Sequence, residues 1–165
     1  MSWLASADHD APAFEGLLAH RPELLALYKR FYGTFWDDAL LPRPLLELCR
    51  RRIAQLHGCE AELAVVDVAS GVTAEQLAAV DAWEAAPCFS AAERAALAVA
   101  EKMPWAHHAI SDDDHAELGR HFTEPQVVAL TVALALFDAN CRLRLAFELP
   151  PSSTTAAPSA AEPLH

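Results

Sequence analysis

Residues 123–147 read TEPQVVALTVALALFDANCRLRLAF, and this stretch decides the fold class of the chain. Apolar residues lie on nearly all sides of its first part, which is typical of a helix buried in a domain core. Pro125 suits the opening turn of a helix, where its backbone needs no N–H. The longest apolar run, Val127–Phe137, is interrupted by Thr131 and is too short to span a bilayer. We therefore expect residues 123–147 to form the central buried helix of a soluble domain.

Earlier segments of the chain also have helical patterns. Thr73 followed by Gln76, and Ser90 followed by Glu93, match the capping box that begins many helices. The sequence contains no convincing strand pattern and no internal repeat. The other expected helices run from Pro22 to Phe35, from Pro44 to Gly58, from Cys59 to Ser70, and onward from Thr73, Ser90 and Ser111. The sequence thus predicts an all-α, single-domain bundle of six or seven helices.

The composition is that of an acidic globular protein. The chain has 165 residues, the length of one domain, and 53% of them are hydrophobic. Twelve Lys and Arg oppose 23 Asp and Glu, and the net charge of -11 disfavours nucleic acid and anionic membranes as partners. The first seven residues contain no basic side chain, so we expect no signal peptide and a cytoplasmic protein. We expect residues 1–13 to be a loose lead-in, 14–149 the helical domain and 150–165 a disordered tail.

The spacing of the four cysteines forms no CxxC pair and no zinc pattern. Cys49, Cys88 and Cys141 lie in apolar surroundings in the sequence, as small buried hydrophobic residues do. Cys59 differs, because it follows Gly58 at the expected start of a helix. The positive end of that helix would lower the pKa of the thiol, whereas neighbouring carboxylates would raise it. A reactive Cys59 and an inert, half-buried one are both compatible with the sequence.

The stretch around Cys59 carries a family resemblance. Residues 47–66 read ELCRRRIAQLHGCEAELAVV. They resemble the AhpD-like (alkyl hydroperoxidase) branch of the carboxymuconolactone decarboxylase family, whose members have a helix with a Glu and then Asn-Gly-Cys-x-x-Cys-x-x-x-His. The resemblance covers about residues 20–148, including HRPELLALYKRFYG at 20–33 and DAWEAAPCFSAAERAALAVAEKM at 81–103. It implies an AhpD-like helical fold.

The resemblance also implies roles for individual residues. Glu47, twelve residues before Cys59, falls on the proton-relay glutamate, and Cys59 falls on the first cysteine, which resolves the disulfide in the family's peroxide chemistry. Glu62 stands where the peroxide-attacking second cysteine is expected. Val66 replaces the relay histidine, and His57 replaces the usual asparagine. The two-cysteine cycle of the family is therefore not intact in this motif.

Three functions remain open from the sequence. The first is thiol-dependent peroxide reduction at Cys59 alone, with an external thiol as reductant and Glu47, Glu62 or His57 handling protons. In a variant of it, Cys49, Cys88 or Cys141 replaces the second cysteine. The second is acid–base chemistry of the decarboxylase type, using Glu47, His57 and Glu62. The third is a non-catalytic scaffold that binds a small apolar ligand.

Some of these polar residues also have structural interpretations. Glu47 is four residues before Arg51, a spacing that favours a helical ion pair, and His57 suits the C-terminal end of a helix. We expect residues 50–52, three consecutive arginines, to pair with carboxylates across a subunit interface. We also expect polar contacts within an oligomer from Asn140, Arg142 and Arg144.

The partners follow mainly from the resemblance. Family members form homo-oligomers, commonly dimers, trimers or hexamers, and we expect the same here. The histidines and aspartates of residues 107–121 look like a metal cluster by composition, but His115 and His121 lie on different faces of a helix. We therefore expect neither a metal ion nor a cofactor, and a hydroperoxide or an apolar molecule as the small-molecule partner.

Overall fold

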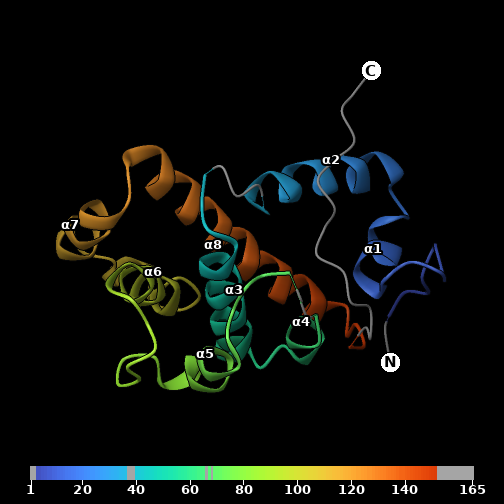
Figure 1. Cartoon of the computed structure of the whole chain (residues 1–165). Helices are drawn as coiled ribbons and strands as arrows, with labels where there is room; N and C mark the ends of the chain where they lie inside the picture. The colour runs from blue at the N-terminus through green and yellow to red at the C-terminus, as the bar shows by residue number, and fades with distance from the viewer. Residues whose placement is uncertain (1–2, 37–39, 66, 68, 152–165) are drawn as a thin grey trace.

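The computed structural model describes residues 3–36, 40–65, 67 and 69–151, and every regular element in them is helical (Figure 1). The α-helices are α1 (Ala13–Leu18), α2 (Pro22–Gly33), α3 (Arg43–His57), α4 (Glu60–Leu63), α5 (Ala74–Ala79), α6 (Ala91–Lys102), α7 (Asp112–His121) and α8 (Glu124–Ala146). Short 3-10 helices follow at Thr34–Trp36, Val80–Ala82 and His107–Ala109. The all-α prediction is confirmed. The described residues contain eight α-helices, one more than the six or seven predicted. The additional helix is α1, which begins at Ala13, the last residue of the expected lead-in.

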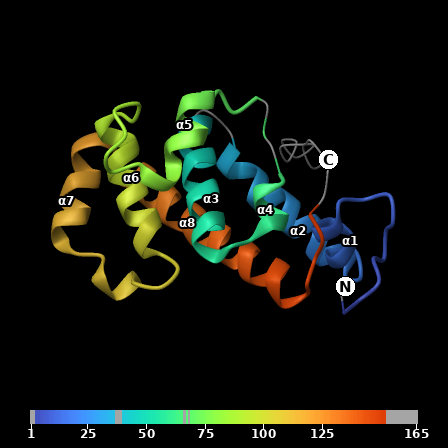
Figure 2. The same ribbon diagram turned by 90° about the horizontal axis from the view of Figure 1, so that it is seen from below.

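Helices α3 and α8 form the centre of the fold. They cross near the middle of the molecule, and α3 also packs on α6 (Figures 1 and 2). The fully buried side chains of these two helices include those of Leu46, Leu48, Ile53, Leu130, Leu134 and Phe137. Burial of each such side chain contributes about 1.5–3 kcal/mol, so this contact is a main source of stability. Helix α7 packs against α6 at one end of the molecule, and α1 packs against α2 at the other.

Helix α8 matches the predicted final helix, but its all-round burial is not found. Val128 is 63% exposed and Leu145 is 45% exposed, while the opposite face is buried against α3. Within the described residues, α8 is the one helix long and apolar enough to cross a membrane by length and composition. Its completely buried residues, such as Phe137, show that it acts as a core helix of the subunit.

The predicted helix from Cys59 to Ser70 is wrong beyond its first turn, since α4 ends at Leu63. Side chains of α3 bind the carbonyl groups that a longer helix would use. Arg50 donates from Nη1 to the Glu62 carbonyl at 2.7 Å and from Nη2 to the Val65 carbonyl at 2.8 Å. These contacts satisfy backbone acceptors without a helix. Val66, where the family has its histidine, lies outside the described residues.

The predicted helix ends near the thiol are confirmed. Gly58 has φ 60° and ψ 33°, a left-handed conformation that glycine adopts without strain. The Cys59 N–H donates to the Ala54 carbonyl at 2.9 Å, and the Gly58 N–H donates to Gln55 at 3.0 Å. This pair of bonds is a Schellman motif. It ends α3 and places Cys59 at the N-cap of α4.

Candidate functional site

A buried group of charged side chains joins α3 to α4. Arg50 donates to both carboxylate oxygens of Glu47, at 2.8 Å each, and to Glu62 Oε1 at 2.7 Å. All three side chains are at most 3% exposed. Burial alone would lower the pKa of Arg50, but the hydrogen bonds to Glu47 and the charge of Glu62 outweigh it and raise the pKa. Arg50 is therefore a fixed cation between two carboxylates.

Arg144 of α8 completes this group on the side of Glu62. Its Nε lies 2.5 Å from Glu62 Oε2, as a close ion pair whose N–H does not point along the contact. The ring of Phe14, from α1, lies on the Arg144 guanidinium at 4.5 Å. Phe14 also packs edge-to-face on Tyr28 of α2. We call Glu47, Arg50, Glu62 and Arg144 the charge cluster.

Cys59 lies beside the charge cluster and faces a second cysteine. Its Sγ donates to the backbone carbonyl oxygen of Cys141 on α8 at 4.0 Å, which places the Cys59 thiol beside residue 141. Both side chains are fully buried. The sequence motif led us to expect a single sulfur here, with Cys141 as only one of three possible replacements. The fold supplies the second sulfur from a helix 82 residues away in the chain.

Neighbouring groups lower the pKa of the Cys59 thiol. The largest cause is the hydrogen bond from the Cys141 thiol, opposed by burial; the Glu62 backbone N–H and the charge of Arg144 also lower it, and the Glu62 carboxylate raises it. The same hydrogen bond and burial raise the pKa of Cys141. The first proton of the pair therefore leaves Cys59. The two opposing effects expected from the sequence both act on the pKa of Cys59: the backbone N–H at the start of α4 lowers it, and the Glu62 carboxylate raises it.

The remaining two cysteines lie in different surroundings. Cys49 is fully buried in α3, and burial raises its pKa to about 12. Cys88 is half-buried in the segment between α5 and α6. Neither thiol is among the groups that shift the pKa of Cys59. Of the three cysteines considered as replacements, Cys141 is therefore the one that the structure places at the site.

His57 points to a separate polar group. Its Nε2 lies 2.6 Å from Asp138 Oδ1, and Arg142 Nε donates to the other oxygen of Asp138 at 2.9 Å. The Trp105 ring lies 4.9 Å from both the His57 ring and the Arg142 guanidinium. Asp138 and Cys141 are three residues apart and so lie on the same face of α8. Their partners, His57 and Cys59, therefore contact adjacent turns of that helix. The structure thus separates His57 from the other three predicted site residues.

Most of the interface contacts expected from the sequence are made within the subunit. Arg52 forms a bidentate pair with Glu101 at 2.5 and 2.8 Å. Asn140 donates from Nδ2 to the Tyr28 hydroxyl at 2.9 Å. The predicted pair of Glu47 with Arg51 exists at 3.9 Å, but it is weaker than the pair with Arg50. The arginine run therefore serves the interior of one chain.

Three residues of the site could not be assigned from the sequence. Arg50 was assigned to an interface, Arg144 to an oligomer contact, and Cys141 to the core. The one local signal is the spacing on α8, since Cys141 and Arg144 are three residues apart and share a helix face. That spacing becomes informative only when α4 is known to lie against it.

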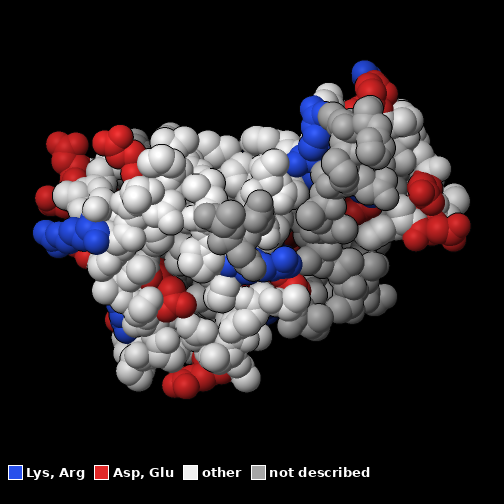
Figure 3. Space-filling view, turned by 45° about the horizontal axis from the view of Figure 1, so that its top comes forward, with Lys and Arg blue, Asp and Glu red and all other residues white. Residues whose placement is uncertain are grey.

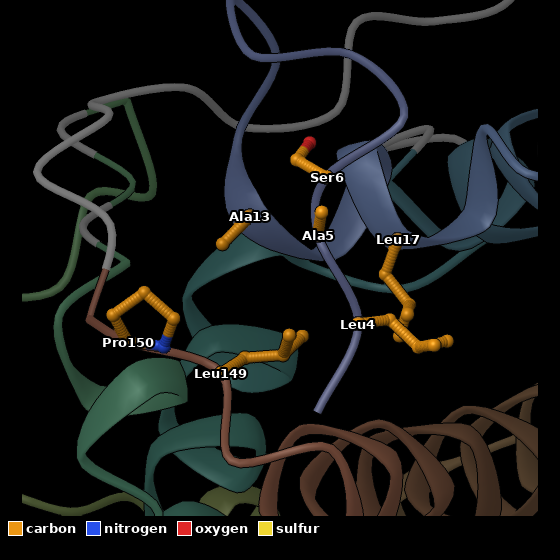
Figure 4. Close-up of a pocket in the computed structure, with 7 residues that line it drawn as sticks. All are labelled: Leu4, Ala5, Ser6, Ala13, Leu17, Leu149 and Pro150. Carbon is orange, nitrogen blue, oxygen red and sulfur yellow. The ribbon is translucent and has the colours of Figure 1, made fainter. Parts of the chain in front are cut away.

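The surface of the protein gives two further observations. A pocket of about 170 Å³ lies between the N-terminal segment and the C-terminal end of the described chain, lined by Leu4, Ala5, Ser6, Ala13, Leu17, Leu149 and Pro150 (Figure 4). Its lining includes no residue of the charge cluster or the thiol pair. On the face in Figure 3, uncharged residues fill most of the middle, and acidic side chains gather mainly toward the ends.

Among the described residues, no group of three or more His, Cys, Asp or Glu is placed to hold a metal ion.

The described residues thus form an all-helical fold with a thiol at the helix start after Gly58. Residues 22–102 match the model of the carboxymuconolactone decarboxylase family. The matched segment contains α2 through α6, and so includes Glu47, Cys59 and Glu62. Cys141 and Arg144 lie beyond it.

Two known proteins are similar to this chain. The uncharacterized protein YnjA of Escherichia coli (strain K12) is 32% identical over 109 residues, which are 62% of this chain and 58% of YnjA. The chain therefore matches less than two thirds of the length of that relative. The solved structure of ATU0492 from Agrobacterium tumefaciens, a protein of unknown function for which an AhpD antioxidant defence role has been suggested, superposes with a TM-score of 0.69. It covers 93% of this chain and 99% of ATU0492 at 18% identity, a likeness of fold.

Proposed function

We propose that this protein is a thiol-dependent oxidoreductase that reduces hydroperoxides at Cys59, with an antioxidant role in the cytoplasm. The observation that carries the proposal is the position of Cys59, whose thiol lies at the start of α4 within reach of the Arg144 charge and the Cys141 thiol. A thiolate is the form of cysteine that attacks a peroxide. The match to the family model adds support, because the same position carries a redox cysteine in the AhpD-like branch.

Each neighbour of Cys59 has a defined part in this chemistry. The Cys59 thiolate attacks one oxygen of the hydroperoxide, the O–O bond breaks, and Cys59 becomes a sulfenic acid while an alkoxide leaves. Arg144 is a preorganised cation near the place where this negative charge develops, and such groups stabilise the transition state. Solvent supplies the proton that converts the alkoxide to an alcohol. One external thiol then condenses with the sulfenic acid to give a mixed disulfide and water, and a second thiol releases Cys59 as a thiol and leaves as the external disulfide.

The geometry gives less support to acid–base chemistry at Glu47 and Glu62. Both carboxylates are bound by Arg50, and neither side chain is more than 3% exposed. A general base needs a proton within hydrogen-bond reach and a free lone pair to accept it. Here the carboxylates fix Arg50, and through it the backbone after α4. We therefore assign Glu47 and Glu62 to positioning the site, and His57 to its separate contact with Asp138.

Access to Cys59 passes through α1 in this proposal. The thiol is fully buried, and Phe14 lies against the outer side of Arg144. Helix α1 has six residues and no side-chain cap at its N-terminus, and in this proposal it moves aside to admit the substrate. Phe14→Ala is expected to raise the rate at which a thiol reagent modifies Cys59. Arg30→Ala, an exposed change on neighbouring α2, is the matched control and leaves that rate unchanged.

Hydroperoxide turnover tests the proposal. Purified protein is mixed with cumene hydroperoxide and dithiothreitol, and peroxide consumption is followed. We expect Cys59→Ser to reduce turnover to the level of the protein-free reaction and Cys88→Ser to retain it. Arg144→Gln should slow the reaction, whereas Arg142→Gln, which pairs with Asp138 instead, should not. Turnover that is equal in the wild-type protein and Cys59→Ser contradicts the proposal.

The proposal includes self-association of the subunit. Leu24, Leu27 and Phe31 lie on one face of α2 and are 48%, 54% and 49% exposed. Val128 and Val132 are exposed on α8 at helical spacing. Contiguous apolar surface of this kind is typical of subunit contacts. Light scattering of the purified protein should give a multiple of the 17.9 kDa subunit mass, and Leu27→Asp with Phe31→Asp should give monomer.

A further inference from the structure

We propose that Cys141 is the resolving cysteine of this site and forms a reversible disulfide with Cys59. The inference rests on the proposed function for its physiological oxidant, a hydroperoxide. It assigns to α8 the sulfur that the family motif would place three residues after Cys59, at the position of Glu62. The geometric basis is the position of the Cys59 Sγ, which lies 4.0 Å from the backbone carbonyl oxygen of Cys141 in the last two turns of α8, with both side chains fully buried.

The surroundings of the two sulfurs favour this reaction over others. Both thiols are fully buried, so the nucleophile closest to an oxidised Cys59 is Cys141 rather than a molecule from solvent. A sulfenic acid condenses with a neighbouring thiol, and this step protects it from further oxidation. Glu62, at the position of the family's second cysteine, cannot be oxidised in such a cycle and is held by Arg50. Cys141 therefore supplies the function that Glu62 cannot.

The step balances in atoms and electrons. The Cys141 sulfur attacks the sulfur of the Cys59 sulfenic acid, an S–S bond forms, the S–O bond breaks, and the proton of Cys141 leaves with the hydroxyl group as water. Together with the first step, two thiols and one hydroperoxide give one disulfide, one alcohol and one water. A dithiol reductant then reopens the bond by exchange and carries away the two electrons as its own disulfide.

The disulfide differs in place from the one expected of the family motif. It would link the N-cap of α4 to α8 across 82 residues of chain. Cys49 is not placed for this role, because the charged group that acts on its thiol is Glu93 of α6 rather than a group of the Cys59 site. Cys88 is half-buried elsewhere and serves as an internal control for non-specific oxidation.

Peptide mapping tests the inference. The native, reduced protein is treated with one equivalent of cumene hydroperoxide or, separately, with diamide, which oxidises dithiols without peroxide. It is then quenched with acid, alkylated with N-ethylmaleimide in denaturant and digested. We expect a Cys59–Cys141 crosslink with both oxidants, with Cys49 and Cys88 alkylated. In Cys141→Ser and Cys141→Ala we expect no crosslink, and more Cys59 trapped by dimedone after peroxide. Cys88→Ser should match the wild-type protein.

The two oxidants separate this inference from the proposed function. A crosslink with diamide but none with hydroperoxide supports the thiol pair and contradicts peroxide reduction. A dimedone adduct at Cys59 of the wild-type protein, with no crosslink under either oxidant, overturns the inference and leaves peroxide reduction standing. No oxidation of Cys59 by either reagent, while Cys88 reacts, contradicts both. A crosslink that joins Cys59 to Cys88 also overturns the inference.

Discussion

The charge cluster and the thiol pair are neighbours between α3, α4 and α8, but they hold their polar groups in opposite ways. In the charge cluster, Arg50 makes three hydrogen bonds to two carboxylates and two more to backbone carbonyls. In the thiol pair, Cys59 has one weak contact at 4.0 Å and a thiol for a partner. The first arrangement opposes any change of charge or position. The second leaves a group that can lose a proton and form a new bond.

This difference shows how one small region can be both rigid and reactive. The ion pairs of Arg50 fix the backbone carbonyls that follow α4, and the Schellman motif at Gly58 fixes the backbone that precedes it. Cys59 lies between these two fixed points. Its sulfur is therefore held in place by groups that take no part in its chemistry.

The largest expected effect is the loss of the cation in the charge cluster. Arg50→Met leaves Glu47 and Glu62 buried without their main counter-charge, which should destabilise the protein by about 3–5 kcal/mol. Arg120→Met is the control, because Arg120 forms an exposed pair with Glu117 and should change stability by about 1 kcal/mol or less. Urea unfolding followed by circular dichroism measures both. Equal effects of the two substitutions would show that the cluster is not structural.

A smaller effect is expected at the turn that joins the two regions. Gly58→Ala places a Cβ on a residue with φ 60°, and should destabilise the protein by about 1–2 kcal/mol, although nothing lies within 4 Å of the new atom. Gly119→Ala has the same open space but lies within helix α7, and should stabilise the protein by about 0.5–1 kcal/mol. Thermal unfolding of both variants measures the contrast. Two shifts of the same sign would contradict the left-handed turn before Cys59.

The smallest expected effect is a change in the titration of Cys59. The Cys141 thiol is the largest cause of its lowered pKa, and burial would remain, so Cys141→Ala should raise the pKa of Cys59. The thiolate exists above this pKa and is lost as the pH falls through it. The wild-type protein should thus form its thiolate at a lower pH than the variant. Ultraviolet absorption of the thiolate, compared with Cys59→Ser as the blank, follows the titration, and an unchanged midpoint would show that the thiols do not interact.

Much of the fold could be predicted because its signals are local. The capping boxes at Thr73 and Ser90 each depend on a side chain three residues away, and the structure contains both. The stop at Gly58 depends on one residue type. The early end of α4 could not be predicted, because Arg50 reaches its carbonyl groups from 12 and 15 residues earlier in the chain.

The candidate site divides in the same way. Cys59 and Glu62 could be singled out from a short motif, and the structure places them side by side with Arg144. Cys141 was expected to be a core residue, and it is buried, but its contact with Cys59 depends on how α8 crosses the end of α3. The exposed side of α8 could not be predicted either, because it also depends on which helices pack against α8. An apolar sequence does not tell whether a neighbour covers it in the same chain.

Nuclear magnetic resonance of protein with isotope-labelled cysteine tests the central claim most directly, because the Cβ chemical shift of each cysteine reports its oxidation state. The Cβ signals of Cys59 and Cys141 should move together into the disulfide range after one equivalent of hydroperoxide, return with dithiothreitol, and leave Cys49 and Cys88 unchanged. Movement of Cys59 alone, or of neither member of the pair, would contradict the account.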